Sequence, residues 1–457
     1  MEPGRWRAPA AHGPVRARLR LPGSKSITNR ALVLAALSSS PSTIASPLKA
    51  RDTTLATAAL RVMGSDITES GTDLSVSPGS LPAGSSVSVD VGNAGTVMRF
   101  LPALAALSPA SVSFDGDPRA RERPVGALLT ALRELGALID DGGRGALPFT
   151  VHGSGQVRGG PVVLDASGSS QLVSGLLLAA PRFTEGVEVR HSGPPVPSLP
   201  HIEMTLRMLE LAGATVESGH IPPAGSPAST LLPDKSDMSG ARPNVWRVRP
   251  GALDLGDFTV EPDLSNAGPF LAAALVTGGS VTIADWPRDS LQAADAILAT
   301  VTEMGADCSL GPDGLTITGP GTVSGIEADL RDIPELCLPL TAVAAVASGP
   351  SVFTGVGHTR AQETDRLAAI AKEINALGGD VSERPDGLTV NPRPLRAAPG
   401  HAFESYDDHR MVMAAAVLGL VTDGVEVLNA ATVGKTFPDF TSVWAEMVQA
   451  GPSEGQH

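Results

Sequence analysis

The segment TALRELGALI, residues 130–139, contains the pattern that decides the fold. Its apolar residues follow the i, i+3/i+4 spacing of an amphipathic helix, and Gly136 ends the run as a C-cap glycine does. The pattern occurs five more times, in TAALRVMGSDI (57–67), TLRMLELAGATV (205–216), ILATVTEMGADC (297–308), IAKEINALGGDV (370–381) and VWAEMVQAG (443–451). The gaps between the glycines Gly64, Gly136, Gly213, Gly305, Gly378 and Gly451 are 72, 77, 92, 73 and 73 residues. This period predicts small α/β subdomains rather than a solenoid.

A second, more apolar helix is predicted in each repeat, after a short strand and a turn rich in Gly, Ser, Asp or Pro. The six instances are GSKSITNRALVLAAL (23–37), GNAGTVMRFLPALAAL (92–107), SGSSQLVSGLLLAA (167–180), EPDLSNAGPFLAAALV (261–276), DIPELCLPLTAVAAVA (332–347) and YDDHRMVMAAAVLGLV (406–421). Strand-like pieces such as SDITES (65–70) and LTITG (315–319) follow the glycines. Each repeat is therefore predicted as strand–helix–strand–helix followed by further strands.

The long gap of 92 residues contains segment 217–244, which is rich in Pro, Gly and Ser and has no periodicity. Such a composition is typical of a loop or linker. It divides six repeats into three plus three, so we expect two α/β domains with a crossover near residues 245–262.

The composition narrows the classes of function. A net charge of −14 and 3% aromatic residues disfavour a nucleic-acid binder, which needs a basic face and stacking rings. Two cysteines exclude a disulfide framework and a cysteine zinc site, and favour a reducing compartment. The apolar runs are too short for a membrane helix, and the arginine-containing N-terminus has no signal-peptide core. We therefore expect a cytoplasmic protein without a membrane partner.

Polar residues gather at the predicted starts of the second helices, where free N–H groups attract anions. They are Lys25, Ser26, Arg30, Asn93, Gly95, Arg99, Ser169, Ser170, Gln171, Glu335, His409 and Arg410, and nearby loops add Arg123, Ser198, His201, Gln362, Glu363, Arg366 and Lys435. Each motif alone has a plainer interpretation. GSKS is an ordinary capped helix and lacks the P-loop pattern. QETDR is a cap plus a Glu363–Arg366 pair, and in YDDHR Asp408 caps a helix beside an exposed His409.

The equivalent placement of these motifs in repeated units favours one shared site. Its cations suit phosphates and carboxylates, and two carboxylates among them are candidates for general acid and base. These are Lys25, Arg30, Arg123, Arg366, Arg410 and Lys435 as the cations, and Glu335 and Glu363 as the carboxylates. No metal-ligand spacing and no dinucleotide fingerprint is present, so we expect neither metal nor cofactor.

As an ordered set, seven motifs resemble the 5-enolpyruvylshikimate-3-phosphate synthase family along nearly the whole chain. They are LPGSKSITNRALVLAAL, GNAGTVMRF, DGDPRARERP, SSQ, ETDRL, YDDHRM and KTFPDF. The resemblance implies an α/β fold of two inverse domains, each of three βαβαββ units, joined by a double-crossover hinge. It places residues 24–260 in the first domain and residues 1–23 plus 261–457 in the second, so that the N-terminal strand joins the C-terminal half.

The resemblance also implies the activity. The family transfers the enolpyruvyl group of phosphoenolpyruvate to the 5-hydroxyl of shikimate 3-phosphate through a tetrahedral intermediate, in the shikimate pathway to aromatic amino acids. No metal or cofactor takes part, and a monomer is expected. Carried over, the catalytic residues are Glu335, Glu363 and Lys25. Shikimate 3-phosphate is assigned to Lys25, Ser26, Arg30, Ser169, Ser170, Gln171, Ser198, Glu335 and Gln362, and phosphoenolpyruvate to Lys25, Gly95, Arg123, Gln171, Arg366, Arg410 and Lys435.

Four positions depart from the commoner family pattern. Glu335 replaces an aspartate, Gln362 a lysine, His358 an asparagine and His201 a tyrosine. Gly95, rather than alanine, resembles the glyphosate-sensitive form.

Two alternative functions remain open. The related UDP-N-acetylglucosamine enolpyruvyl transferase uses a cysteine on a mobile loop. Here Cys337 lies in a predicted apolar helix and Cys308 in a predicted strand, and both are expected to be buried. A non-catalytic sensor of phosphorylated metabolites would need the cations but neither Glu335 nor Glu363.

Overall fold

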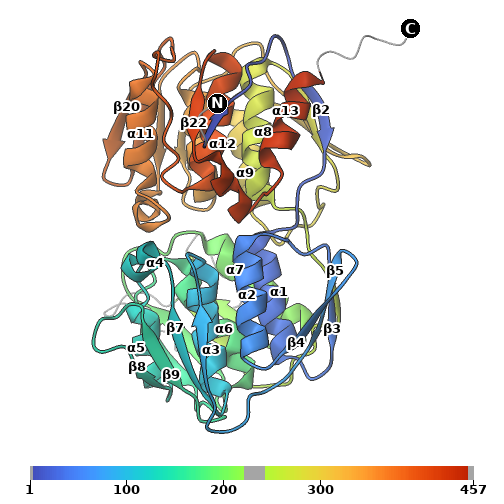
Figure 1. The fold of residues 1–457 in the computed structure, drawn as a ribbon, viewed down its shortest axis with the longest axis vertical. Helices are drawn as coiled ribbons and strands as arrows, with labels where there is room; N and C mark the ends of the chain where they lie inside the picture. Colours follow the sequence, from blue (N-terminus) through green and yellow to red (C-terminus); the bar gives the residue numbers. More distant parts are fainter. Residues whose placement is uncertain (1–3, 221–241, 451–457) are drawn as a thin grey trace. The chain divides into compact units, whose positions relative to one another are not determined.

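The computed structural model describes residues 4–220 and 242–450. Its contacts divide the chain into two compact units (Figure 1). The first unit is Lys25–Val260, and the second combines Met1–Ser24 with Glu261–His457. The chain therefore passes from the second unit to the first after Ser24, and returns after Val260.

The first unit consists of three βαβαββ repeats, each with a four-stranded sheet. The first repeat contains β14 (Asp257–Thr259), α1 (Lys25–Leu37), β3 (Ser42–Ala45), α2 (Arg51–Val62), β4 (Asp66–Ser70) and β5 (Asp73–Ser77). The second contains β6 (Ser86–Asp90), α3 (Gly95–Leu107), β7 (Ser111–Asp115), α4 (Pro118–Glu122), α5 (Gly126–Glu134), β8 (Leu138–Asp140) and β9 (Phe149–His152). The third contains β10 (Gly160–Leu164), α6 (Ser170–Ala179), β11 (Val187–His191), α7 (Leu199–Leu211), β12 (Val216–Gly219) and β13 (Val245–Val248).

The second unit follows this plan in its first two repeats. Its first repeat contains β2 (Arg16–Leu19), α8 (Leu264–Thr277), β15 (Ser280–Ile283), α9 (Ala294–Glu303), β16 (Asp307–Gly311) and β17 (Gly314–Thr318). The next contains β18 (Glu327–Asp329), α10 (Cys337–Ala344), β19 (Ser351–Thr354), α11 (Arg366–Ala376), β20 (Asp380–Arg384) and β21 (Gly387–Asn391). The last contains α12 (His409–Val421), β22 (Glu426–Leu428), α13 (Phe440–Gln449) and the N-terminal strand β1 (Arg5–Arg7).

Every four-stranded sheet has the same order of strands, as in β6-β7-β9-β8. The first two strands are parallel and the others antiparallel; Val89 is opposite Phe114, and Phe114 is opposite Phe149. Two repeats take their first strand from a distant part of the chain. β2 precedes α1 in sequence but pairs with β15, and β14 precedes α8 but pairs with β3. This exchange is what the double crossover consists of.

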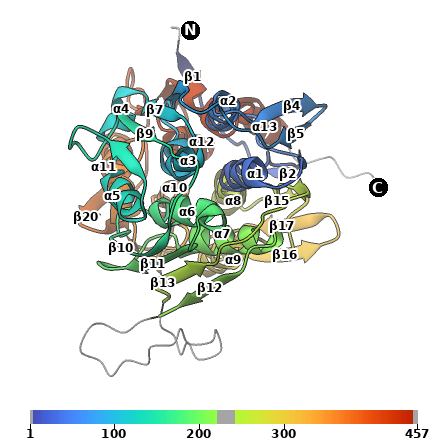
Figure 2. The same ribbon diagram turned by 90° about the horizontal axis from the view of Figure 1, so that it is seen from below.

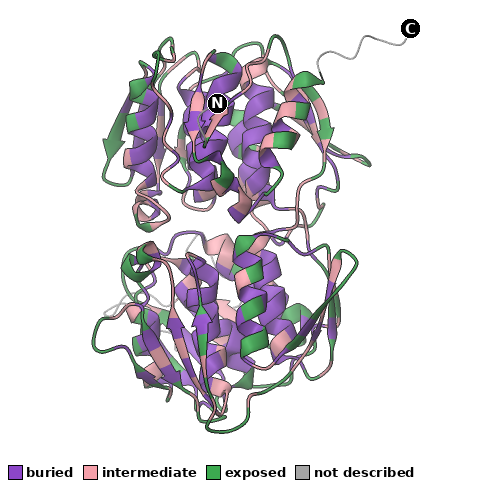
Figure 3. Ribbon diagram, in the orientation of Figure 1, coloured by how far each residue is buried: buried purple, intermediate pink, exposed green. Residues whose placement is uncertain are grey.

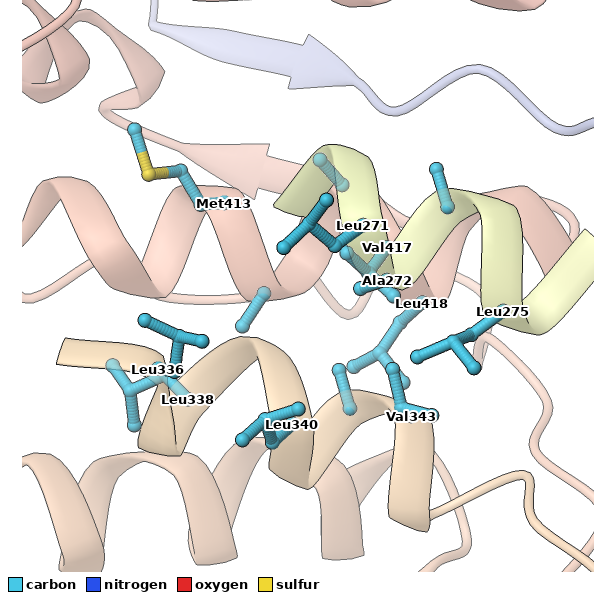
Figure 4. Close-up of a cluster of buried hydrophobic side chains, with 14 of the residues drawn as sticks. Leu271, Ala272, Leu275, Leu336, Leu338, Leu340, Val343, Met413, Val417 and Leu418 are labelled. Carbon is cyan, nitrogen blue, oxygen red and sulfur yellow. The ribbon is translucent and has the colours of Figure 1, made fainter. Parts of the chain in front are cut away.

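Three apolar helices form the core of each unit (Figure 2). α1, α3 and α6 contact one another in the first unit, and α8, α10 and α12 in the second. All eight residues of α10 are buried, as expected for a helix that is apolar on every side. Figure 3 shows that α8, a central helix of the same unit, is also largely buried. Leu271 of α8, Leu340 of α10 and Val417 of α12 belong to the shared cluster (Figure 4). Packing along the whole length of these helices consequently fixes the positions of their N-termini.

The structure confirms the α/β class and the predicted helix–glycine repeat. Five of the six repeat glycines have the positive φ of a left-handed C-cap: Gly64, Gly136, Gly213, Gly305 and Gly378. Gly451 lies outside the described residues. A side chain at Gly64 would also meet the backbone of Ser80 at 2.8 Å, so this position excludes a Cβ for two reasons.

Two expectations need correction. The loop or linker expected over 217–244 does not join the halves, because its first residues belong to β12, which pairs antiparallel with β13 in one sheet. It is an insertion within the third repeat, and its residues 221–241 lie outside those described. The sixth repeat has no four-stranded sheet within the described ranges: β22 pairs with β1, and Phe403 forms a single bridge to Val427. The preceding segment 392–399 contains three prolines, which cannot donate to a ladder.

Candidate active site

In the first unit, hydrogen bonds join the starts of the three central helices. Asn29 of α1 donates through Nδ2 to the Thr96 hydroxyl of α3 at 2.6 Å. Arg99 of α3 donates through Nη1 to Oε1 of Gln171 on α6 at 2.9 Å. Every residue of α6 except Gln171 is buried. Three helix N-termini, each with unsatisfied N–H groups and a positive dipole end, are therefore linked by side chains at one place.

Lys25 begins α1 and forms an ion pair with a buried carboxylate. Its Nζ lies 3.4 Å from Oδ2 of Asp52, whose side chain is 4% exposed, against 19% for Lys25. Asp52 stands in the first turn of α2. The ion pair holds the ammonium group near the N-terminus of α1.

The side chain of Arg30 is buried inside the first unit instead of being open to a ligand. Its guanidinium is 5.0 Å from the ring centroid of Phe100. It donates to the Thr205 hydroxyl at 2.7 Å and to the carbonyls of Ser26 and His201, each at 2.9 Å. Burial lowers the pKa of Arg30 to about 9. The structure thus gives Arg30 a role in tying α1 to α7, and its contact with substrate stays a prediction.

Gly95 is the first residue of α3 and lies directly beneath a buried guanidinium. Arg123, which is 4% exposed, donates through Nη1 to the Asn93 carbonyl at 2.9 Å and to its side-chain oxygen at 3.1 Å. A Cβ at Gly95 would lie 2.6 Å from Nη2 of Arg123 and 3.0 Å from Nη1 of Arg99. The absence of a side chain at Gly95 is what lets Arg123 approach the helix N-terminus.

Two of the predicted serines of this unit, Ser169 and Ser198, are helix N-caps. Ser169 caps α6 by accepting from the Gln171 N–H at 3.3 Å, and Ser170 beside it is buried. Ser198 precedes α7 with φ of 52°, a left-handed conformation that a non-glycine residue rarely adopts. Such strain is concentrated at functional sites. His201 stands one turn further along α7 and is half-buried.

In the second unit, a buried ion network centres on Arg366. This guanidinium lies 2.7 Å from Oδ2 of Asp408 through Nε and 2.9 Å from Oε2 of Glu363 through Nη2. Lys435 forms an ion pair with the other oxygen of Glu363. The side chains of all four residues are at most 7% exposed. The carboxylates of Asp408 and Glu363 hold the pKa of Arg366 above its ordinary value despite burial.

Arg410 lies beside this network but bonds to uncharged acceptors. It donates through Nη2 to the Ser265 hydroxyl at 2.9 Å and through Nη1 to the Glu335 carbonyl at 3.1 Å. Burial and the nearby charge of Arg366 lower the pKa of Arg410. Glu335, in the short 3₁₀ helix Pro334–Leu336, is half-buried, and its carboxylate acts electrostatically on both arginines. The unit thus gathers two guanidiniums and an ammonium around two candidate proton-transfer groups.

Gln362 and His358 do not belong to the start of any of the three central helices of the second unit. Both belong to the turn that leads into α11, where His358 is part of the 3₁₀ helix Gly357–Ala361 and Gln362 is its C-cap. Each side chain is half-buried. Asp365, in the same loop, caps α11 by accepting from the Ala368 N–H at 3.1 Å. The plainer interpretation of QETDR, a cap plus a Glu363–Arg366 pair, is therefore correct, and it coexists with the ion network.

Two details of the sequence interpretation are wrong. His409 is not exposed, because it is the first residue of α12 and only 1% of it is accessible. Cys308 is not a core residue, because it is half-buried in β16 near the Thr302 hydroxyl, at 3.5 Å. Cys337 is buried as expected, and desolvation raises the pKa of its thiol to about 12.

Asp52, Asp408 and Ser265 were not predicted as members of the site. Asp408 was recognised only as a helix cap, a function it does perform for Arg410 N–H at 2.9 Å. Nothing in the local sequence of Asp52 or Ser265 distinguishes them from ordinary polar residues. Their importance comes from Lys25 and Arg410, which reach them across the fold.

Two features, a membrane-spanning helix and a metal-binding cluster, are absent from residues 4–220 and 242–450. No helix there is long and apolar enough to cross a membrane. No group of three or more His, Cys, Asp or Glu side chains in the same ranges could hold a metal ion.

Comparisons with known proteins agree with one another. The model of the family described as EPSP synthase (3-phosphoshikimate 1-carboxyvinyltransferase) matches residues 9–227 and 237–444. A protein of Kocuria rhizophila named 3-phosphoshikimate 1-carboxyvinyltransferase is 48% identical over 453 residues, which cover 97% of this chain and 96% of that protein.

Two solved structures of EPSP synthase from Acinetobacter baumannii are also similar, each with 23% identity. One has a TM-score of 0.76 and covers 98% of both chains. The other has a TM-score of 0.75 and covers 96% of this chain and 97% of its own. At this identity the two structures establish a common fold alone.

Proposed function

The chain belongs to the EPSP synthase family, and from this premise we propose how its residues perform the family's reaction. It transfers the enolpyruvyl group of phosphoenolpyruvate to the 5-hydroxyl of shikimate 3-phosphate and releases phosphate. The proposal concerns which side chains bind the substrates and which move protons.

The observation that carries the proposal is the environment of Arg410. Its guanidinium is buried, yet its hydrogen bonds go to the uncharged oxygens of Ser265 and Glu335. A buried charge is costly unless a counter-charge compensates it. The carboxylates near Arg410 do not outweigh burial and the charge of Arg366, which together lower its pKa. The anionic groups of phosphoenolpyruvate would supply that counter-charge, with Arg366 and Lys435 as the neighbouring cations. In the first unit, Arg123 above Gly95 and Lys25 at the start of α1 offer the same chemistry.

Shikimate 3-phosphate is assigned chiefly to the first unit. The hydroxyls and N–H groups at the start of α6 suit a phosphate, because helix N-termini bind anions. The residues of this assignment are Lys25, Ser26, Ser169, Ser170, Gln171 and Ser198, with Arg30 orienting α1 and α7 around them. Gln362, which replaces a lysine, is a neutral hydrogen-bonding group in this role.

Two carboxylates carry the protons in this mechanism. Glu335 accepts the proton of the 5-hydroxyl while that oxygen attacks C2 of phosphoenolpyruvate. Glu363 first gains a proton from the ammonium group of Lys435, with which it pairs, and passes this proton to C3. It then takes a proton back from the new methyl group and returns it to Lys435 as phosphate leaves, and Glu335 gives its proton to the departing phosphate. The surrounding cations stabilise the negative charge of the tetrahedral intermediate and of the departing phosphate.

A substrate comparison tests the function itself. With phosphoenolpyruvate present, we expect steady release of phosphate with shikimate 3-phosphate and none with UDP-N-acetylglucosamine. The buried Cys337 thiol, with a pKa near 12, is not the accessible cysteine that the nucleotide-sugar enzyme needs. Turnover with the nucleotide sugar alone would contradict the proposal. Tight binding of both shikimate 3-phosphate and phosphoenolpyruvate without turnover would instead favour a sensor.

Replacing Gly95 by alanine is expected to weaken the binding of both phosphoenolpyruvate and glyphosate. The new methyl group would lie 2.6 Å from Arg123 Nη2 and displace this guanidinium from the ligand. Since hydrogen bonds to charged groups contribute about 1.5–3 kcal/mol, we expect KM for phosphoenolpyruvate to rise about tenfold. Steady-state kinetics with glyphosate as a competitor of phosphoenolpyruvate measure both effects.

The matched control for this substitution is Gly251→Ala. Gly251 belongs to the same unit, has no positive φ and has open space where a Cβ would be added. Its kinetics should match those of the wild type. Phosphoenolpyruvate kinetics that are insensitive to millimolar glyphosate in the wild-type protein would contradict the proposed glyphosate-sensitive site.

The cellular setting is also a proposal. Cys308 and Cys337 are both free thiols, as expected in a reducing cytoplasm. A monomeric state stays a prediction, to be checked by light scattering.

A further inference from the structure

The two residues before the Asp408 cap form a strained turn. Tyr406 and Asp407 have φ of 53° and 56°, so two consecutive non-glycine residues adopt the left-handed conformation. Each such residue costs about 1 kcal/mol or more, and the surroundings must hold it in place. The next residues along the chain are Asp408, which pairs with Arg366, and Arg410. The turn thus lies at the start of α12, next to Asp408 of the ion network and close in sequence to Arg410.

One side of the turn is bonded to α11. The Tyr406 hydroxyl donates to Oε1 of Glu373 at 2.6 Å, and Glu373 is only 2% exposed. The other carboxylate oxygen of Glu373 accepts the Glu404 N–H at 3.2 Å. Glu373 stands seven residues, about two helical turns, after Arg366 on α11, so both lie on the same face of that helix. The bond therefore links the turn to the face of α11 that carries Arg366.

The other side of the turn is bonded to the segment that ends in Lys435. The Asn429 side-chain amide donates to the Asp407 carboxylate, and the Thr432 hydroxyl donates to the Asp407 carbonyl at 2.9 Å. Asn429 precedes and Thr432 belongs to the 3₁₀ helix Ala430–Lys435. A shift of this helix would move Lys435 relative to Glu363.

We propose that Tyr406 and Asp407 are positioning residues that fix Arg366, Arg410 and Lys435 in register for phosphoenolpyruvate. The turn contacts the elements carrying all three cations, yet none of its atoms belongs to the ion network. The inference rests on the proposed assignment of these cations to phosphoenolpyruvate. Burial and the Glu373 carboxylate raise the pKa of Tyr406, so its hydroxyl stays a donor throughout the working pH range.

Two isosteric variants test the turn from its two sides. Tyr406→Phe removes the bond to Glu373, and Thr432→Val removes the bond to the Asp407 carbonyl. Because small misplacements of binding groups have large kinetic effects, we expect each to raise KM for phosphoenolpyruvate about tenfold, with KM for shikimate 3-phosphate almost unchanged. Thr316→Val is the matched control, since it removes a hydroxyl pair with Thr282 at 2.9 Å in a sheet of the same unit.

Tyr406 is the only tyrosine of the chain, which gives a spectroscopic signature. Protein labelled with 3-fluorotyrosine should show one ¹⁹F resonance, and Thr432→Val should shift or broaden it while Thr316→Val should not. A resonance unmoved by Thr432→Val would contradict the coupling across the turn. This measurement remains informative if Tyr406→Phe does not fold.

Arg366→Lys separates failure of this inference from failure of the proposed function. If Arg366→Lys raises KM for phosphoenolpyruvate and Tyr406→Phe does not, the positioning role is wrong and the assignment of the cations stands. If Arg366→Lys leaves that KM unchanged, the assignment itself is wrong, and the positioning role fails with it. If both raise KM for phosphoenolpyruvate alone, both proposals are supported.

Discussion

Glu335→Gln is expected to lower turnover by about 10²–10⁴ while leaving the fold and substrate binding intact, as for loss of a general acid–base group. The carboxylate acts on Arg366 and Arg410 through its charge. Arg410 donates to the backbone carbonyl of Glu335, so the amide variant keeps that contact. The amide also keeps the size of the side chain but cannot accept the 5-hydroxyl proton.

The measurement is the kcat for phosphate release, with both KM values and the melting temperature taken alongside. Glu327→Gln is the matched control, because Glu327 is exposed on β18 of the same repeat. Glu335→Asp, which restores a carboxylate one methylene shorter, should recover much of the turnover. If Glu335→Gln turns over at nearly the wild-type rate, the proton acceptor lies elsewhere.

Arg366→Met is expected to destabilise the protein by about 3–5 kcal/mol, because removing one partner leaves buried charges uncompensated. Asp408, whose side chain is completely buried, would lose its bonds at 2.7 and 3.2 Å. Glu363, at 6% exposure, would lose its bond to Arg366 at 2.9 Å. Methionine nearly fills the space of the arginine stem, so the loss reports charge rather than a cavity.

Urea unfolding monitored by circular dichroism measures this effect. The matched control is Arg393→Met in the same unit, where Arg393 pairs with Asp380 at 2.9 Å but is 60% exposed. Exposed pairs contribute about 0–1 kcal/mol, so the control should unfold almost as the wild type does. Equal stability of the two variants would show that the Arg366 network does not hold the second unit together.

Much of the fold is predictable because its signals are local. Helical spacing and C-cap glycines depend on residues within a few positions of one another, and five of those glycines have the required positive φ. The sheet of the sixth repeat could not be predicted from local sequence, because it depends on β1, some 420 residues from β22 in the chain. The same holds for the insertion at 217–244, which resembles a linker until β12 and β13 are seen to pair.

The site divides in the same way. The sequence by itself determined that similar α/β repeats exist and that polar and charged residues stand at the starts of their apolar helices, since periodicity and capping are local properties of the chain. Only the tertiary structure decided that Arg366 pairs with Asp408 across 42 positions, that Lys435 reaches Glu363 across 72, and that Arg30 turns inward to Thr205. Those partners follow from how the central helices pack, and packing brings together residues whose separation in sequence carries no signal of their contact.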